Sequence, residues 1–190
     1  AGVTEWAIDL KPPRYYEAYL HTGFADDRVK AFALTSGNIW LGTRNGLVRH
    51  DFNKNIWRTY HHAHHLTDNR INDLVATLDF LYVATDAGVS RVLLRSVGSD
   101  TMRIRSVKQG SLGTVTVYDL AWQSNLIWMG TEYGIYVYDA DQDSGGFYKG
   151  AYGPSNRATY AVSVYDNEVW FGTEEGVAAF DVQTREWLTG

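Results

Sequence analysis

The sequence predicts an all-β protein: a β-propeller of four nearly complete four-stranded blades, preceded by half of a further blade at the N-terminus. Three observations predict this fold. A nine-residue phrase occurs four times, the spacing of its copies matches the length of one blade, and short alternating strands flank every copy. No segment keeps a helical period of apolar residues for three turns.

The recurring phrase combines a strand with a tight turn. Its first copy is IWLGTRNGL, at 39–47, and the later copies are LYVATDAGV, IWMGTEYGI and VWFGTEEGV. Successive copies are 42, 46 and 42 residues apart, counted between Thr43, Thr85, Thr131 and Thr173. A period of about 40–45 residues is typical of a propeller blade. The glycine of each Thr-x-x-Gly turn supplies a positive φ at no steric cost.

Each copy predicts four strands, named a to d from the centre of the propeller outward. The a strands are expected upstream of the phrase, at 28–34, 70–77, 115–121 and 159–164. The b strands lie in the phrase itself, and the c strands follow its turn, at 46–51, 88–93, 134–139 and 176–181. The d strands are expected at 56–60, 102–107, 146–149 and 185–188. The predicted blades are therefore 26–67, 68–110, 111–154 and 155–190.

Residues 1–25 are predicted to be the outer half of a blade. Gly2-Val3 and Ile8-Asp9 repeat the beginning and end of a c strand, and 15–20 repeat a d strand. No a or b strand accompanies them, and an open ring has unpaired edges. Two explanations stay open: the chain is a segment of a longer propeller, or another chain or a second copy completes the ring. An atypical small closure is the third alternative.

Two further sets of residues have predicted structural roles. The large aromatic residues of the b strands are expected to pack between neighbouring blades; they are Trp40, Tyr82, Trp128 and Trp170. The aspartates that end three of the c strands are expected to make Asx hydrogen bonds in the following turn; they are Asp51, Asp139 and Asp181.

Composition and missing motifs exclude several functions. The net charge of −5 argues against nucleic acid as a partner, and no apolar run is long enough to span a membrane. The absence of cysteine excludes disulfides, zinc–thiolate sites and a cysteine nucleophile. The sequence contains no nucleophile elbow, no phosphate-binding loop and no zinc-binding His-Glu helix, so an enzyme is not expected.

The candidate binding face is the one that carries the d–a and b–c connections, which share one side of a propeller. Its predicted residues are Arg44, Asn45, His61, His62, His64, His65, Asp86, Glu132, Tyr133, Glu174 and Glu175. The carboxylates among them, Asp86, Glu132, Glu174 and Glu175, would form an acidic rim that suits a cation or an amine. The alternative for these four residues is a role as solvated turn residues.

The histidine-rich loop is the only candidate for metal binding. Histidines at 61, 62, 64 and 65 could bind a divalent metal or change charge between pH 5 and 8. Adjacent residues of an extended loop point in opposite directions, so the alternative is a solvated polar loop. No other cofactor is expected.

The repeat resembles that of the two-component regulator propeller family. The resemblance rests on an opening phrase, LTDNRINDL at 66–74 with shorter versions at 25–30 and 155–159, followed by Trp-x-Gly-Thr-x-x-Gly. Blade two departs from the pattern with Tyr82 and Ala84, and two c–d connections are longer. The resemblance implies the periplasmic sensor portion of a hybrid sensor kinase, or a secreted or surface-bound accessory domain. It therefore implies a periplasmic or extracellular location.

The predicted function is a non-catalytic binding or sensing module that recognises a protein partner, a glycan or another small ligand. Tyr15, Tyr133 and Tyr152 are candidate aromatic anchors. One alternative is a structural subunit of a multiprotein assembly, or a homo-oligomer, which the incomplete ring favours. The other is an enzyme similar to the streptogramin-lyase-type propellers, which use a histidine on the central face and a divalent ion; the histidine-rich loop suggests it.

Overall fold

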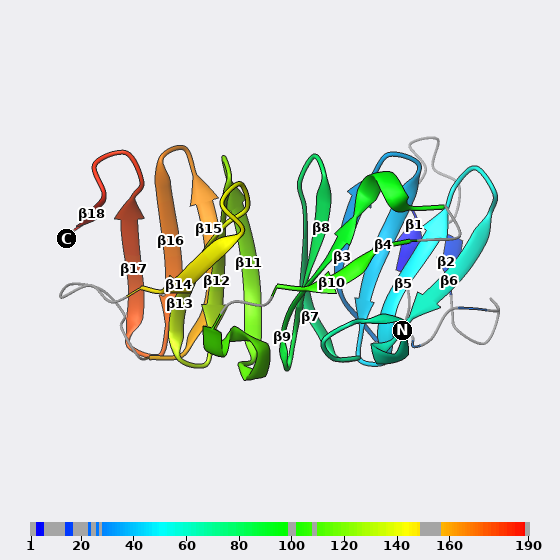
Figure 1. The fold of residues 1–190 in the computed structure, drawn as a ribbon, viewed down its shortest axis with the longest axis horizontal. Coiled ribbons are helices and arrows are strands. Elements are labelled where there is room, and N and C mark those ends of the chain that lie inside the picture. The colour runs from blue at the N-terminus through cyan, green and yellow to red at the C-terminus, as the bar shows by residue number, and fades with distance from the viewer. Residues whose placement is uncertain are drawn as a thin grey trace.

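The computed structural model describes residues 3–5, 14–16, 23, 26, 28–98, 102–107, 110–148 and 157–188. Within them the protein consists of four antiparallel four-stranded sheets and one two-stranded sheet. The four sheets follow one another in chain order across Figure 1, as the blades of a propeller do. The predicted fold class is confirmed. No helix in the described part of the chain is long and apolar enough to span a membrane.

The four blades take their strands in the predicted order, from a to d. Blade 1 contains β3 (Val29–Thr35), β4 (Asn38–Thr43), β5 (Gly46–Asp51) and β6 (Ile56–Tyr60). Blade 2 contains β7 (Ile71–Ala76), β8 (Phe80–Thr85), β9 (Gly88–Leu93) and β10 (Ile104–Ser106). Blade 3 contains β11 (Val117–Gln123), β12 (Leu126–Thr131), β13 (Gly134–Asp139) and β14 (Ser144–Phe147). Blade 4 contains β15 (Thr159–Tyr165), β16 (Glu168–Thr173), β17 (Gly176–Asp181) and β18 (Glu186–Leu188).

The remaining elements are short. The N-terminal segment contains two short strands that pair antiparallel, β1 (Val3–Glu5) and β2 (Arg14–Tyr16). Their assignment to the c and d strands of a further blade stays a prediction. The end of the predicted d strand, 17–20, lies outside the described residues. Three 3₁₀ helices connect strands: η1 (His62–His64), η2 (Leu94–Ser96) and η3 (Gly110–Thr114). Among the strands of the four blades, the largest differences from the predicted bounds are in β10, which is three residues shorter, β11, which lies two residues later, and β14, which lies two residues earlier.

The Thr-x-x-Gly turn has the same hydrogen bonds in each blade. In blade 1 the Thr43 hydroxyl donates to the carbonyl of Gly46 over 2.8 Å and accepts from the amide of Asn45 over 3.1 Å. Gly46 has a φ of 118°, which explains why glycine occupies this position of the turn. The predicted Asx turns are also present. The Asp51 carboxylate accepts from the amides of Asn53 and Lys54, and Asp139 and Asp181 do the same in their blades.

The hydrophobic core lies between the blades. Trp40 packs against β7 and β8 of blade 2, Tyr82 against β11 and β12 of blade 3, and Trp128 against β15 and β16 of blade 4. Each of these three side chains is buried, as predicted. The prediction was wrong for Trp170, which is 43% exposed. The reason is that no described blade follows blade 4 and covers this face of its sheet.

The inner strands of neighbouring blades are joined by two aspartates. The a strands contact each other across the blade interfaces, and each carries a register irregularity after its first residue. The Asp73 carboxylate accepts from the amide of Leu120 over 2.9 Å. The Asp119 carboxylate accepts in the same way from the amide of Val162 over 2.6 Å. Each aspartate therefore ties its own blade to the backbone of the next.

Candidate functional site

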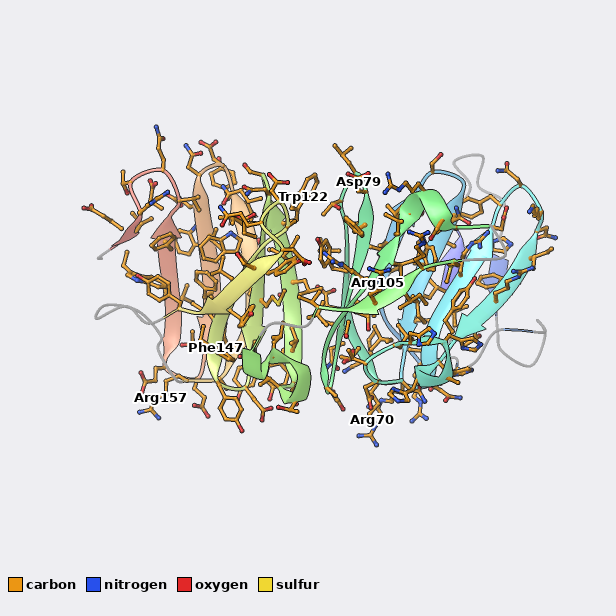
Figure 2. All side chains as sticks on the ribbon, viewed as in Figure 1. Arg70, Asp79, Arg105, Trp122, Phe147 and Arg157 are labelled. Carbon is orange, nitrogen blue, oxygen red and sulfur yellow. The ribbon has the colours of Figure 1, made fainter. Side chains whose placement is uncertain are left out.

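The b–c turns and d–a connections lie on one face, as predicted; we call it the turn face. Backbone hydrogen bonds join the two kinds of connection in each blade. Gly46 donates to Asn69 over 2.8 Å, and the amides of Asp86, Glu132 and Glu174 donate to the carbonyls of Arg70, Thr116 and Ala158. In Figure 2 Arg70 and Arg157 mark this edge of the propeller, and Asp79 and Trp122 mark the opposite edge.

Three of the four predicted rim carboxylates are held by neighbouring groups. Asp86 accepts from the Asn72 side-chain amide over 2.9 Å and lies 3.6 Å from the Arg70 guanidinium. The Glu132 carboxylate accepts from the amide of Thr116 over 2.8 Å. Glu175 lies 3.1 Å from the guanidinium of Arg157. Neighbouring side chains thus hold Asp86 and Glu175, and a backbone amide holds Glu132.

Two tyrosines that the sequence prediction missed lie beside the rim carboxylates Asp86, Glu132 and Glu174. Tyr118 and Tyr160 are the second residues of β11 and β15, and their ring centroids are 5.1 Å apart. The pKa of Tyr118 is raised, first by burial and then by the negative charges of Glu132, Asp86 and Glu174. Its phenol therefore stays protonated, and carboxylates from three blades act on it. We call Tyr118, Tyr160, Asp86, Glu132 and Glu174 the inner cluster.

A repeat signal could have revealed these tyrosines. The second residue of each a strand forms one series, Lys30, Asn72, Tyr118 and Tyr160. Lys30 donates to the Asn72 side-chain carbonyl over 2.7 Å, and the Asn72 amide reaches both Asp86 and the carbonyl of Val117. A comparison of equivalent positions in the four blades would have placed all four side chains on the inner strands.

The other predicted residues of the binding face are not part of the inner cluster. Arg44 and Asn45 are exposed in the turn of blade 1, and Tyr133 is exposed in that of blade 3. Tyr15 is in β2, and Tyr152 lies outside the described residues.

The histidine-rich loop folds around η1. The amide of His61 donates to His64 Nδ1 over 2.9 Å, and His62 Nδ1 lies 2.8 Å from the carbonyl of Leu66. Two of the imidazoles thus take part in hydrogen bonds within the loop. Among the described residues, no three His, Asp or Glu side chains are grouped closely enough to hold a metal ion.

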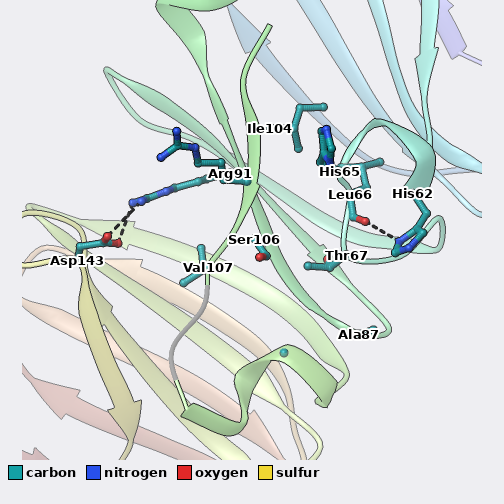
Figure 3. A pocket seen from close by; sticks show the side chains of 12 residues that line it. His62, His65, Leu66, Thr67, Ala87, Arg91, Ile104, Ser106, Val107 and Asp143 are labelled. Carbon is teal, nitrogen blue, oxygen red and sulfur yellow. Dashed lines mark hydrogen bonds and ion pairs between the residues drawn. The ribbon is translucent and has the colours of Figure 1, made fainter.

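A cavity of about 780 Å³ lies away from the inner cluster, at the rim between blades 2 and 3. Figure 3 shows Arg91 reaching across it to Asp143, with Ser106 and Val107 of the outer edge of blade 2 between this pair and the histidine-rich loop. The Arg91 guanidinium is 3.0 Å from the Asp143 carboxylate and donates to the Tyr138 hydroxyl over 2.7 Å. These contacts connect blades 2 and 3.

Comparison with known proteins shows that this chain is similar to them in fold alone. No family model and no curated protein matches the sequence. A chain described as the extracellular domain of a one-component system, BT4673 from B. thetaiotaomicron, is similar with a TM-score of 0.73 and 21% identity, over 92% of this chain and 23% of that one. The extracellular domain of BT3049, described as a hybrid two-component system of the same organism, has a TM-score of 0.67 and 14% identity, over 93% and 25% of the two chains.

A third similar structure is PorZ of Porphyromonas gingivalis, described as an essential surface component of the type-IX secretion system. It has a TM-score of 0.74 and 18% identity, over 99% of this chain and 31% of that one. This chain thus spans about a quarter to a third of the length of these three structures. Its fold is that of a β-propeller similar to extracellular domains of two-component systems, consistent with the resemblance of its repeat to the two-component regulator propeller family.

Proposed function

We propose that this chain is a non-catalytic recognition module of a periplasmic or extracellular protein, and that it binds a small cationic ligand at the inner cluster of the turn face. The observation that carries the proposal is the pair of Tyr118 and Tyr160 rings, 5.1 Å apart, near Glu132, whose carboxylate the Thr116 amide holds in place. The negative charges of Glu132, Asp86 and Glu174 raise the pKa of Tyr118, which supports the same site. The likeness in fold to extracellular sensor domains supports the location and the sensing role. The module would signal or assemble through the rest of a larger protein.

The chemistry of the inner cluster favours an amine. Carboxylates form charge-assisted hydrogen bonds with an ammonium group, and aromatic faces add a cation–π attraction. Glu132 is held by a backbone amide, so its charge is already oriented before a ligand arrives. The face of Tyr160, which is exposed, is available beside it. A preformed site of this kind loses little conformational entropy on binding.

A matched pair of sugars tests this proposal. We expect glucosamine, which carries an ammonium group, to bind in isothermal titration calorimetry, and N-acetylglucosamine, which is neutral, to bind at least about tenfold more weakly. The double variant Glu132→Gln/Glu174→Gln should lose most of the affinity for glucosamine. The glutamine that replaces Glu132 can still accept the bond from the amide of Thr116, so the change removes charge and keeps the turn.

The control variant is Asp79→Asn/Glu186→Gln. It also removes two negative charges, from the opposite edge and from β18, and should bind glucosamine as the wild type does. Equal weakening by the two double variants, or equal binding of the two sugars, would contradict an amine site at the inner cluster.

A second candidate function, a subunit of an assembly, is favoured by the two end faces of the row of blades. On blade 4, Tyr165, Trp170 and Val177 are exposed on one face of the sheet, and the residues equivalent to Trp170 and Val177 in blades 1 to 3 are buried. On blade 1, Phe32 and Leu34 are exposed on the side of the sheet opposite blade 2. Exposed apolar faces of this kind mark surfaces of association.

Light scattering tests this second function. We expect the mass of the chain to rise above the monomer value of 21.4 kDa as its concentration increases. Trp170→Glu/Val177→Glu should shift the protein toward the monomer, because a buried charge opposes contact between apolar faces. A constant mass of 21.4 kDa for the wild type at all concentrations would rule out self-association through these faces.

A further inference from the structure

Four arginines gather on the outer half of blade 2, on the side that faces blade 3. Arg91 in β9 lies directly opposite Arg105 in β10. Arg95 in η2 and Arg103 just before β10 complete the group. Together with Phe80 and Leu93, the four arginines line a pocket of about 180 Å³. In Figure 2 Arg105 lies between the two faces of the propeller, far from the edge that Arg70 marks.

The fold does not require this pair of arginines. Like charges directly opposite each other in a sheet are destabilising. The equivalent c–d pairs are Val137 with Gly146 in blade 3 and Ala179 with Leu188 in blade 4. Blade 1 does have a second such pair, Arg49 with Arg58, but there the Asp51 carboxylate, 2.6 Å away, neutralises Arg49. Asp143 neutralises Arg91 of blade 2 in the same way, so blade 2 differs from blade 1 in the two further arginines, Arg95 and Arg103, that stand beside its pair.

The charges of the group are only partly compensated. Asp143 neutralises Arg91, whose guanidinium also lies 5.2 Å from the centre of the Phe80 ring. Arg95, Arg103 and Arg105 are exposed and form no ion pair with any described residue. Three guanidinium groups thus remain without a neutralising carboxylate among the described residues, at one place in a chain whose net charge is −5. Such a local excess of positive charge attracts anions.

The pocket continues into the cavity between blades 2 and 3. Arg91 and Arg105 line both, and the cavity adds Ser106, Thr67 and His65 (Figure 3). Its volume of about 780 Å³ is within the usual range of small-molecule sites. A ligand could therefore place a charged group on the arginines and its remaining atoms in the cavity.

We propose that this rim cleft binds a small molecule that carries an oxyanion group, a carboxylate, phosphate or sulfate. The planar guanidinium groups of Arg103 and Arg105 match such groups through paired N–H donors. Arg91, which Asp143 and Tyr138 hold in place, forms the fixed wall of the site. The site is separate from the inner cluster and takes a ligand of the opposite charge, so it does not depend on the function proposed above.

Calorimetric titration of the whole chain with citrate, inorganic phosphate and inorganic sulfate, at constant ionic strength, tests the proposal. We expect at least one of the three to bind with one site per chain, and glycerol, the neutral control, not to bind. Arg103→Gln/Arg105→Gln should weaken that binding by about tenfold or more, since it removes two charge-assisted contacts. The response to each anion identifies which oxyanion the cleft prefers.

The matched control is Arg44→Gln/Arg185→Gln, which removes two exposed arginines from other parts of the chain and should change the affinity less than about twofold.

The melting temperature gives a second readout. Without an anion, Arg103→Gln/Arg105→Gln should melt at or above the wild-type temperature, because it relieves like-charge repulsion. Addition of the anion should raise the melting temperature of the wild type and of the control variant only. If Arg103→Gln/Arg105→Gln does not fold, Arg95→Gln replaces it. Binding of none of the three anions, or equal weakening by both double variants, would overturn the proposal.

Discussion

Replacement of Trp40 by alanine is expected to lower the free energy of unfolding by about 3–5 kcal/mol. The Trp40 side chain is completely buried between blades 1 and 2, against Leu74 and Leu81, and its indole N–H donates to the Thr35 hydroxyl over 2.9 Å. Alanine leaves a cavity that the two rigid sheets cannot close, and it leaves a hydroxyl without its donor. Urea denaturation followed by circular dichroism measures the change.

Trp170→Ala is the matched control, since Trp170 occupies the same position of the repeat in blade 4. Its side chain is partly exposed, and its indole N–H donates to Glu168 on the same strand. Its replacement should cost about 1 kcal/mol or less in the isolated chain. Equal costs for Trp40→Ala and Trp170→Ala would contradict the placement of these two residues, because burial is the main difference between their surroundings.

The second large effect concerns Asp73. Burial, and then a hydrogen bond and charge repulsion from Asp119, raise the pKa of Asp73 from 3.8 to about 7. Below pH 4 the Asp73 carboxyl is protonated in both the folded and the unfolded chain. Between pH 4 and 7 the folded chain keeps the proton that the unfolded chain has lost, so stability falls as pH rises. Above pH 7 the loss is complete.

Asp73→Asn should remove this loss of stability at high pH. The asparagine stays neutral at every pH, its carbonyl can accept from the amide of Leu120, and its amide can donate to Asp119. We expect the variant to be more stable than the wild type by about 3–4 kcal/mol at pH 8 and nearly equal to it at pH 4. Urea midpoints at pH 4, 6 and 8 measure the difference.

The control for this prediction is Asp79→Asn, at the exposed a–b turn of the same blade. It should change stability little and equally at all three pH values. A difference between Asp73→Asn and the wild type that does not grow between pH 4 and pH 8 would show that folding does not raise the pKa of Asp73.

The repeat and the structure within one blade follow from the sequence alone. The Thr-x-x-Gly turn and the c-strand aspartate are local features, because their hydrogen bonds join residues within a few positions of each other. A period of 42 to 46 residues then implies stacked blades, since one sheet alone cannot bury its faces. The sharing of the turn face by both kinds of connection follows from the same repeat.

The contacts between blades depend on how the sheets pack and could not be predicted from the repeat. Trp170 matches Trp40 and Trp128 in the sequence, yet its burial depends on a neighbouring sheet that the described chain lacks. The inner cluster joins residues of three blades, and the contact of Asp73 with Asp119 joins two. The opposition of Arg91 and Arg105 depends on strand register across a long connection. These contacts link residues many positions apart, and the distance between such residues is set by the packing of sheets, which a local pattern does not encode.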